Sequence, residues 1–150
     1  MKTLLLCLFI CPAAFAQTPS DETAVKATIT QLFDGMRKTD TTAMKVLFLP
    51  TAKLQTVAKT KQGDVVVQET PISGFVTSVG KAKAGALDER LSGMAVNIDG
   101  ELATAWTPYT FYYNGQKSHC GVNAFTLVRS AGTWKIQNII DTRRRDNCPD

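Results

Sequence analysis

"AWTPYTFYYNGQKSHCGVNAFTLVRSAGTWKIQNIIDTRR", residues 105–144, is the stretch that decides the fold of this chain. It consists of three segments rich in β-branched and aromatic residues, separated by Asn114-Gly115 and by Ser130-Ala131-Gly132. Asn-Gly is a strong hairpin signal, because both central residues of a type I′ turn need a positive φ. The stretch therefore predicts three consecutive antiparallel strands, and Asp99-Gly100 predicts a fourth ahead of them, over residues 88–98.

The part of the chain before these strands is mainly helical. Between Glu22 and Lys38 apolar residues recur at helical spacing, at Val25, Ile29, Leu32, Phe33 and Met36. A shorter helix is expected to begin at Asp40 or Thr41 and to stop at Pro50, and a third is expected from Pro71. Residues 53–70 predict a hairpin with its turn at 61–64. Helices segregated from a meandering sheet indicate an α+β domain.

The first sixteen residues have the layout of a secretory signal peptide. Lys2 precedes an apolar run, and Ala14-Phe15-Ala16 is a small-x-small cleavage site before Gln17. A lipoprotein processed at Cys11 is disfavoured by the bulky Ile10 ahead of that cysteine. We therefore expect a signal peptide over residues 1–16, a single domain over residues 17–150, and a periplasmic or secreted protein with no membrane association after cleavage.

Export leaves two cysteines in the mature chain, Cys120 and Cys148. An even pair in an oxidising compartment favours a disulfide. A straight strand would carry Cys148 well past Cys120, so the pairing requires the chain to turn back after Arg145.

The only histidine, His119, stands next to Cys120. Neighbouring residues on a strand point to opposite faces, which disfavours both a shared metal and a Cys-His nucleophilic pair. We expect no metal and no cofactor. Two interpretations of His119 stay open: a hydrogen-bonded core histidine, or a catalytic acid/base or ligand donor, because imidazole titrates near neutral pH.

The turns also predict which side chains share a face of the sheet. With a two-residue turn at Asn114-Gly115, His119 pairs with Thr110 and Asn123 pairs with Trp106. This register predicts a helix-covered face on which a few polar groups stand among large apolar ones, as in ligand pockets. The expected ligand-binding residues are Trp106, Tyr112, His119, Asn123, Phe125 and Asn138.

The opposite face is also largely apolar, and we expect it to associate in a homodimer. On that face Asp141 and Arg143 are expected to form a surface ion pair, with orientation of a polar ligand group as the alternative. Arg143-Arg144-Arg145 is the one concentrated basic feature of a chain with a formal net charge of +4. Next to Asp146 it is typical of a solvated strand end, and we expect no nucleic-acid partner.

Residues 22–145, above all "YxFYYNGxxxHCGxxxF" and "GTWKIxxIxDTRR", resemble the nuclear transport factor 2-like superfamily, and within it the secreted SnoaL-like and lumazine-binding-like bacterial domains. The resemblance implies a cone in which three helices pack in the concavity of a strongly curved sheet, often dimeric, with a pocket at the wide end. Some relatives are ketosteroid isomerases or scytalone dehydratases. Their full catalytic sets have no match here, where Tyr112, His119 and Asp141 are single candidates.

Three hypotheses about function follow from these patterns. The first is an exported domain that binds an unknown small apolar or cyclic molecule, without catalysis. The second is an isomerase, dehydratase or cyclase that uses His119 as its acid/base. The third is an interaction module that recruits another protein through the outer face of the sheet.

Overall fold

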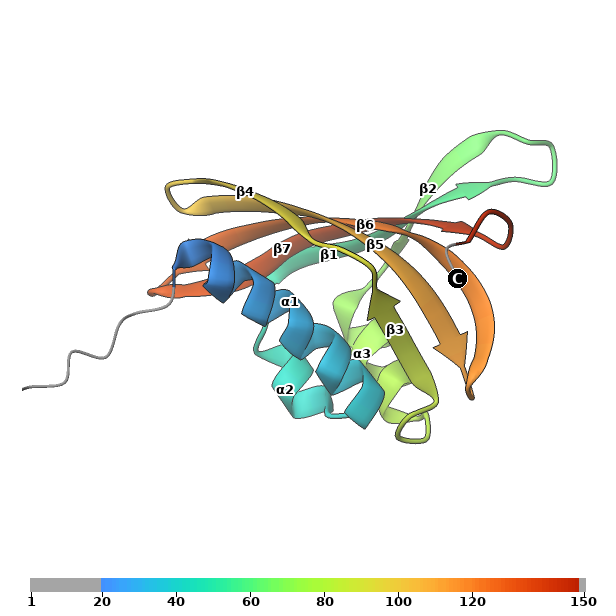
Figure 1. The fold of residues 1–150 in the computed structure, drawn as a ribbon, viewed down its shortest axis with the longest axis horizontal. Coiled ribbons are helices and arrows are strands. Elements are labelled where there is room, and N and C mark those ends of the chain that lie inside the picture. The colour runs from blue at the N-terminus through green and yellow to red at the C-terminus, as the bar shows by residue number, and fades with distance from the viewer. Residues whose placement is uncertain (1–19, 149–150) are drawn as a thin grey trace, which may run out of the picture.

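The computed structural model describes residues 20–148, and in it three helices pack on one face of a single curved sheet (Figure 1). The helices are α1 (Asp21–Lys38), α2 (Thr41–Lys45) and α3 (Ile72–Gly80). The strands are β1 (Phe48–Lys59), β2 (Val65–Thr70), β3 (Leu87–Leu91), β4 (Ala95–Asp99), β5 (Leu102–Tyr113), β6 (Gln116–Ser130) and β7 (Thr133–Arg144). None of the helices in residues 20–148 is long and apolar enough to cross a membrane. The predicted α+β class and the order of its elements are confirmed.

Helix α1 forms where the apolar spacing predicts it. The hydroxyl of Ser20 caps its first turn by accepting a hydrogen bond from the backbone N–H of Thr23 at 3.3 Å. Its buried face includes the whole predicted apolar stripe, namely Val25, Ile29, Leu32, Phe33 and Met36. This face supplies the centre of the hydrophobic core under the sheet.

Helix α2 is shorter than predicted. Asp40 caps it through the N–H of Ala43 at 2.9 Å, but the helix ends at Lys45 and strand β1 begins at Phe48. Pro50 therefore lies inside a strand instead of ending a helix. It falls where the pairing of β1 with β7 is interrupted, between Phe48 and Lys53. A proline is tolerated there because its missing N–H removes no hydrogen bond from the ladder.

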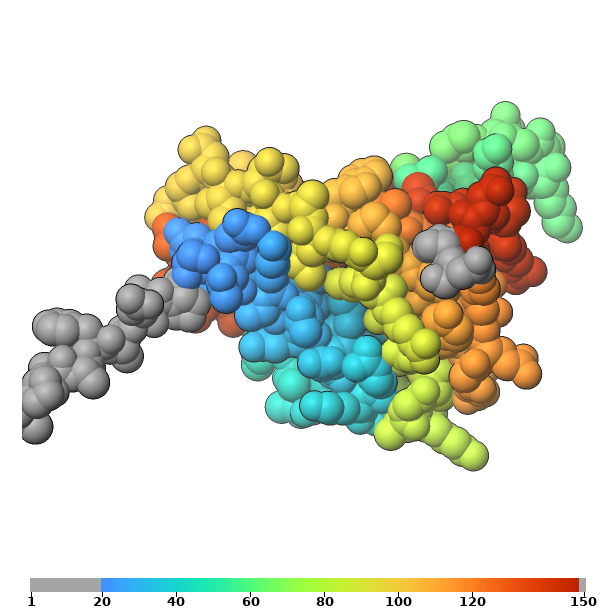
Figure 2. Space-filling model, viewed as in Figure 1, coloured from blue at the N-terminus to red at the C-terminus, as the bar shows by residue number. Residues whose placement is uncertain are grey.

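The strands lie in the order β2-β1-β7-β6-β5-β3, with β4 also paired to β5. All neighbours are antiparallel except β1 and β7, which run parallel. The predicted hairpin of β1 and β2 projects beyond the body of the molecule (Figures 1 and 2). The three helices lie against one face of the sheet, away from the projecting hairpin, and they leave the other face of the sheet open (Figure 1).

Residues 88–98 were expected to form one strand, but they are divided between β3 and β4. Both pair with β5, and the gap between them lies opposite Pro108. Proline has no N–H to donate, so a continuous partner strand would lose a ladder bond at this position. The chain instead bends at Ser92, whose N–H donates to the Pro108 carbonyl at 2.9 Å.

Two bulges change the register on which the predicted faces depend. Tyr113 pairs with Gln116 as expected, but Ser118 is an extra residue in β6, so that His119 faces Phe111 instead of Thr110. In β7 the pair of Arg129 and Trp134 is as expected, and a second shift follows at Gln137. Each inserted residue moves the following side chains to the opposite face of the sheet.

Because of the two bulges, the faces predicted for β5 and for the part of β7 beyond Gln137 are wrong. On β5 the residues that point to the helices are Ala103, Ala105, Thr107, Tyr109 and Phe111, whereas Leu102 and Trp106 lie on the open face. On β7, Asn138 and Ile140 were expected to face the helices. Beyond the bulge it is Ile139 and Asp141 that are buried there.

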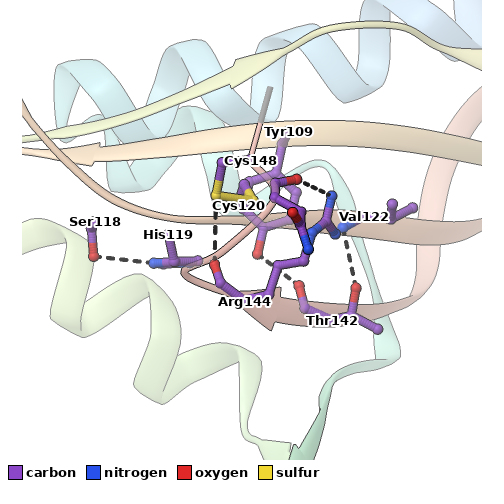
Figure 3. Close-up of a disulfide and its surroundings, with 9 residues drawn as sticks. Tyr109, Ser118, His119, Cys120, Val122, Thr142, Arg144 and Cys148 are labelled. Carbon is purple, nitrogen blue, oxygen red and sulfur yellow. Dashed lines mark hydrogen bonds between the residues drawn. A yellow bond between two sulfur atoms is a disulfide. The ribbon is translucent and has the colours of Figure 1, made fainter. Parts of the chain in front are cut away.

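The predicted disulfide joins Cys120 and Cys148, whose Cα atoms are 5.5 Å apart (Figure 3). As the sequence required, the chain turns back after β7. Asn147 has a positive φ of 50°, and its carbonyl accepts a hydrogen bond from Arg144 at 3.5 Å. The tail covers Cys120, which is fully buried although it lies on the face away from the helices.

Candidate functional site

A cavity of about 480 Å³ lies between helix α3 and the inner faces of β3, β5, β6 and β7. Its walls are mainly apolar and come from α1, α3, β3, β5 and the loop after α3: Met36, Phe75, Val79, Ala82, Leu87 and Phe111. Volumes of this size, with a few polar groups in an apolar wall, are typical of small-molecule sites.

One set of polar groups at the cavity is centred on Asp141. Its Oδ2 accepts hydrogen bonds from Arg143 Nε at 2.7 Å and from the hydroxyl of Tyr109 at 3.3 Å. Asp141 is 5% exposed, and its Oδ1 is buried with no partner among the described residues. Burial raises the pKa of Tyr109, and the nearby carboxyls of Glu89 and Asp141 raise it further, so the phenol stays neutral and donates.

Glu89 is the second carboxyl group of the cavity. Its Oε1 accepts a hydrogen bond from Asn123 Nδ2 at 2.8 Å, and the same amide lies 3.4 Å from the hydroxyl of Thr107. Burial raises the pKa of Glu89 to about 7, and the charge of Asp141 acts in the same direction against the opposing effects of Asn123 and Arg143. The cavity therefore contains a carboxyl that takes up and releases a proton near neutral pH.

His119 also lines this cavity. Its Nδ1 lies 3.1 Å from the hydroxyl of Ser118, which leaves Nε2 for a ligand (Figure 3). The ring packs against Phe111 at 5.0 Å and edge-on against Tyr109 at 5.8 Å between centroids. Burial lowers the pKa of His119, and Arg143 lowers it further, so the imidazole is neutral at pH 7.

Gly121 allows Tyr109 to reach across the sheet. The two residues are paired in the ladder, and the Tyr109 hydroxyl donates to the Thr142 carbonyl at 3.1 Å. A Cβ on Gly121 would collide with that carbonyl and would approach the Tyr109 ring to 3.0 Å. Only glycine therefore permits this close approach of β6, β7 and the phenol ring.

A second cavity of about 530 Å³ lies between α1 and the segment from Glu89 to Met94. Its charged groups are already engaged with one another or with neighbours. Arg37 is bonded to Asp34 at 3.0 Å and to Asp88 at 2.8 Å, and Arg90 pairs with Asp88. The first cavity is the better candidate because Asp141 Oδ1, at its lining, has no hydrogen-bond partner among residues 20–148.

Of the six residues expected to bind a ligand, only His119 lines the first cavity. Trp106 is 56% exposed on the open face, and Asn138 lies on that face also, with its Oδ1 buried and unpaired. Tyr112 stacks under the guanidinium of Arg90 at 4.2 Å. Phe125 is core, edge-on to Phe33 at 6.2 Å. Asn123 does not line the cavity, but its amide donates a hydrogen bond to Glu89, which does.

Glu89, Tyr109, Asp141 and Arg143 were missed or assigned to the wrong face. Asp141 and Arg143 were expected to form a surface pair, but the carboxylate is buried and both residues line the cavity. A signal for Glu89 was present in the period of two along Leu87, Glu89 and Leu91. Since the two leucines face the core, the residue between them must also point inward.

Within residues 20–148, no group of three or more His, Cys, Asp or Glu side chains is arranged to hold an ion. The side chains that line the cavity can donate and accept hydrogen bonds and pair charges, and Glu89 and His119 can also transfer a proton.

Comparison with known proteins gives a family and a fold. The family described as "Putative lumazine-binding" matches residues 20–140. No curated protein matches the chain significantly. A nuclear transport factor 2-like protein of unknown function from Shewanella baltica is 16% identical with a TM-score of 0.65, over 87% of this chain and 100% of that one.

Two further solved structures have the same fold. A protein with a cystatin-like fold from Novosphingobium aromaticivorans is 14% identical with a TM-score of 0.66, over 85% of this chain and 83% of that one. A structure from Streptomyces avermitilis, described as a putative dehydratase, is 14% identical with a TM-score of 0.63, over 83% of this chain and 96% of that one. At these identities the likeness shows the fold alone.

Proposed function

Because the chain belongs to the family described as "Putative lumazine-binding", within the nuclear transport factor 2-like superfamily, we propose that it is an exported domain that binds a small molecule in the first cavity. The observation that carries the proposal is the combination of an apolar cavity of about 480 Å³ with a buried polar network at its lining. A buried network of this kind costs stability unless its groups are satisfied, and a ligand is one way to satisfy them.

Native mass spectrometry of protein purified from its own host tests this proposal, since a ligand of the cavity is expected to be retained. Lumazine, the flat bicyclic compound in the family's name, is the first pure compound to titrate. The matched variants are Ala82→Phe, which fills the cavity, and Ala84→Phe, which changes an exposed residue outside it. The first should lose the ligand and the second should keep it. Equal retention by both variants would contradict binding in this cavity.

The proposal of export is supported by the signal-like leader in the sequence and by the disulfide between Cys120 and Cys148. The leader lies outside the described residues. Intact mass of the protein from its host tests export, because cleavage after Ala16 should leave a chain that begins at Gln17. A mature chain that retains residues 1–16 would argue against it.

A second candidate function is acid/base catalysis, and Glu89 is the observation that favours it. A carboxyl with a pKa of about 7 beside a second carboxyl, in one cavity with His119, has the properties of a proton-transfer group. If the protein is an enzyme, Glu89→Gln should lower kcat by about 10²-fold or more while substrate binding persists. Binding without turnover in both proteins would leave the domain a binder only.

We further propose that the open face of the sheet associates with a second copy of this chain. Trp106 is 56% exposed there and Leu102, on the same face of β5, is 48% exposed, so an association that covers both would remove two large apolar side chains from water. Light scattering should give a dimer for the native chain and a monomer for Trp106→Arg. A native monomer would instead favour a different protein partner on this face.

A further inference from the structure

We propose that the ligand of the first cavity is an organic anion, with an apolar, ring-sized body and one carboxylate or similar acidic group that is received by the guanidinium of Arg143. This inference rests on the proposed function, because it names the ligand class of the same cavity. It follows from which polar groups around the cavity are already used and which remain free.

Arg143 is held in place on one side and free on the other. Its Nε donates to Asp141 Oδ2 at 2.7 Å, and that carboxylate is itself fixed by Tyr109. The Arg143 side chain is nevertheless 54% exposed, and neither Nη1 nor Nη2 has a hydrogen-bond acceptor within residues 20–148. A guanidinium with two free, oriented N–H₂ groups is matched to a carboxylate, which it can bind with two parallel hydrogen bonds.

The other polar groups of the lining include a second cation. Asp141 Oδ2 is occupied by two donors, and Oδ1 is closed off from solvent. Lys81, at the C-terminal cap of α3, adds a second cation to the lining, while His119 is neutral and its Nδ1 is already engaged with Ser118. Two cations, Arg143 and Lys81, therefore line the cavity, which favours a ligand group that accepts hydrogen bonds and carries negative charge.

Glu89 is the group that could oppose an anion. The groups that face it are Asn123 on β6, Asp141 and Arg143 on β7, and Tyr109 on β5. With a pKa of about 7 it is protonated in a large fraction of molecules at neutral pH, and it is then a donor. An anion that enters beside it would raise this fraction, so binding should be accompanied by uptake of a proton.

The apolar walls of the cavity indicate that the anion is organic. Inorganic phosphate or sulfate would contact Arg143 but would leave the apolar surface of Phe75, Leu87 and Phe111 in water. A ring system attached to the acidic group would cover this surface, and removal of apolar area from water is a main source of affinity for small ligands.

A calorimetric titration with 2-naphthoate and with its uncharged amide, 2-naphthamide, separates the charge from the ring. The native protein should bind the carboxylate more tightly than the amide. In Arg143→Gln the affinity for 2-naphthoate should fall by about tenfold to a hundredfold, the range for a charged hydrogen bond, and the affinity for 2-naphthamide should change little. Arg144→Gln is the matched control, because Arg144 is the next residue on the strand, is exposed and does not line the cavity.

A second pair of variants covers the case in which Arg143→Gln destabilises the fold by leaving Asp141 short of a partner. Lys81→Gln removes the exposed cation of the lining, and Lys83→Gln removes an exposed cation outside it. Lys81→Gln should lower the affinity for 2-naphthoate by about twofold to fivefold, as expected for an exposed charge pair, and Lys83→Gln should leave this affinity unchanged.

The inference is overturned if 2-naphthamide binds the native protein as tightly as 2-naphthoate and the two lysine variants behave alike. That result would leave small-molecule binding itself intact. If neither compound binds the native protein, while Ala82→Phe and Ala84→Phe purify with the same content of small molecules, the proposed function fails together with the inference.

Discussion

The pH dependence of stability provides a direct test of the environment assigned to Glu89. The perturbation is Glu89→Gln, which keeps the shape of the side chain and its acceptor for Asn123 but cannot lose a proton. In the folded protein the pKa of Glu89 is raised from 4.5 to about 7, so between these values the native state binds more protons than the unfolded chain. Stability must then fall as the pH rises through this window.

The magnitude follows from the size of the shift. The difference between 7 and 4.5 is about 2.5 pKa units, and each unit corresponds to about 1.4 kcal/mol, which gives an upper value of about 3.5 kcal/mol. Below pH 4.5 the carboxyl is protonated in both states and this contribution is absent. Above pH 7 the native protein keeps the full penalty of an ionised, partly buried Glu89, whereas Glu89→Gln does not.

The assay is urea unfolding of both proteins at intervals from pH 4.5 to 8.5. The free energy of unfolding of the native protein minus that of Glu89→Gln should decrease by up to about 3.5 kcal/mol across the window and then level off. His119 titrates in both proteins, so its contribution cancels in the difference. Two curves that stay parallel from pH 4.5 to 8.5 would refute the assignment of a proton-binding carboxyl with a raised pKa at this position.

The other predictions concern the frame around the cavity. Gly121→Ala should lower the free energy of unfolding by about 2–4 kcal/mol in urea titrations, because its methyl group would collide with the carbonyl of Thr142; a loss below about 0.5 kcal/mol would mean that the strands can separate freely. Cys148→Ser should lower it by about 3–4 kcal/mol through loss of the cross-link to Cys120, and reduction of the native protein should have the same effect; free thiols in the native protein would rule out the bond. The imidazole of His119, the only one in the chain, should titrate below 6.5 by NMR, and acid should destabilise the native fold more than that of His119→Gln; a midpoint above 6.5 would contradict its burial beside Arg143.

The sequence predicted the elements well and the faces of two strands badly. Helix α1 and the hairpins at Asn114-Gly115 and Lys61-Gln62-Gly63-Asp64 depend on local spacing and on turn residues, and these were confirmed. The extra residues Ser118 and Gln137 have no distinctive local pattern. A bulge is stabilised by what its neighbours bury, so a residue-by-residue count across a turn does not reveal it.

The candidate site illustrates the same limit. His119 was found because a single histidine on a strand beside a cysteine is conspicuous, and its face was right because Phe125 and Leu127 anchor β6 by hydrophobic matching. Asp141 and Arg143 were noticed as a pair but were placed on the outer face. The prediction assumed strict alternation of side chains along β7, and the bulge at Gln137 interrupts that alternation. Glu89 was overlooked although its alternation with Leu87 and Leu91 was present in the sequence.

By itself the sequence determined the class of the fold, the order of its helices and strands, and the pair of cysteines available for a bond, because these depend on periodicity, turn chemistry and composition. Only the tertiary structure decided which side chains meet in the cavity. Glu89, Tyr109 and Asp141 come from three different strands. Their meeting depends on the bulges and on the curvature of the sheet, and the pKa of Glu89 depends on the burial and the charges that result. A burial that involves residues far apart in the chain is a property of the packed molecule, and no single segment of the sequence encodes it.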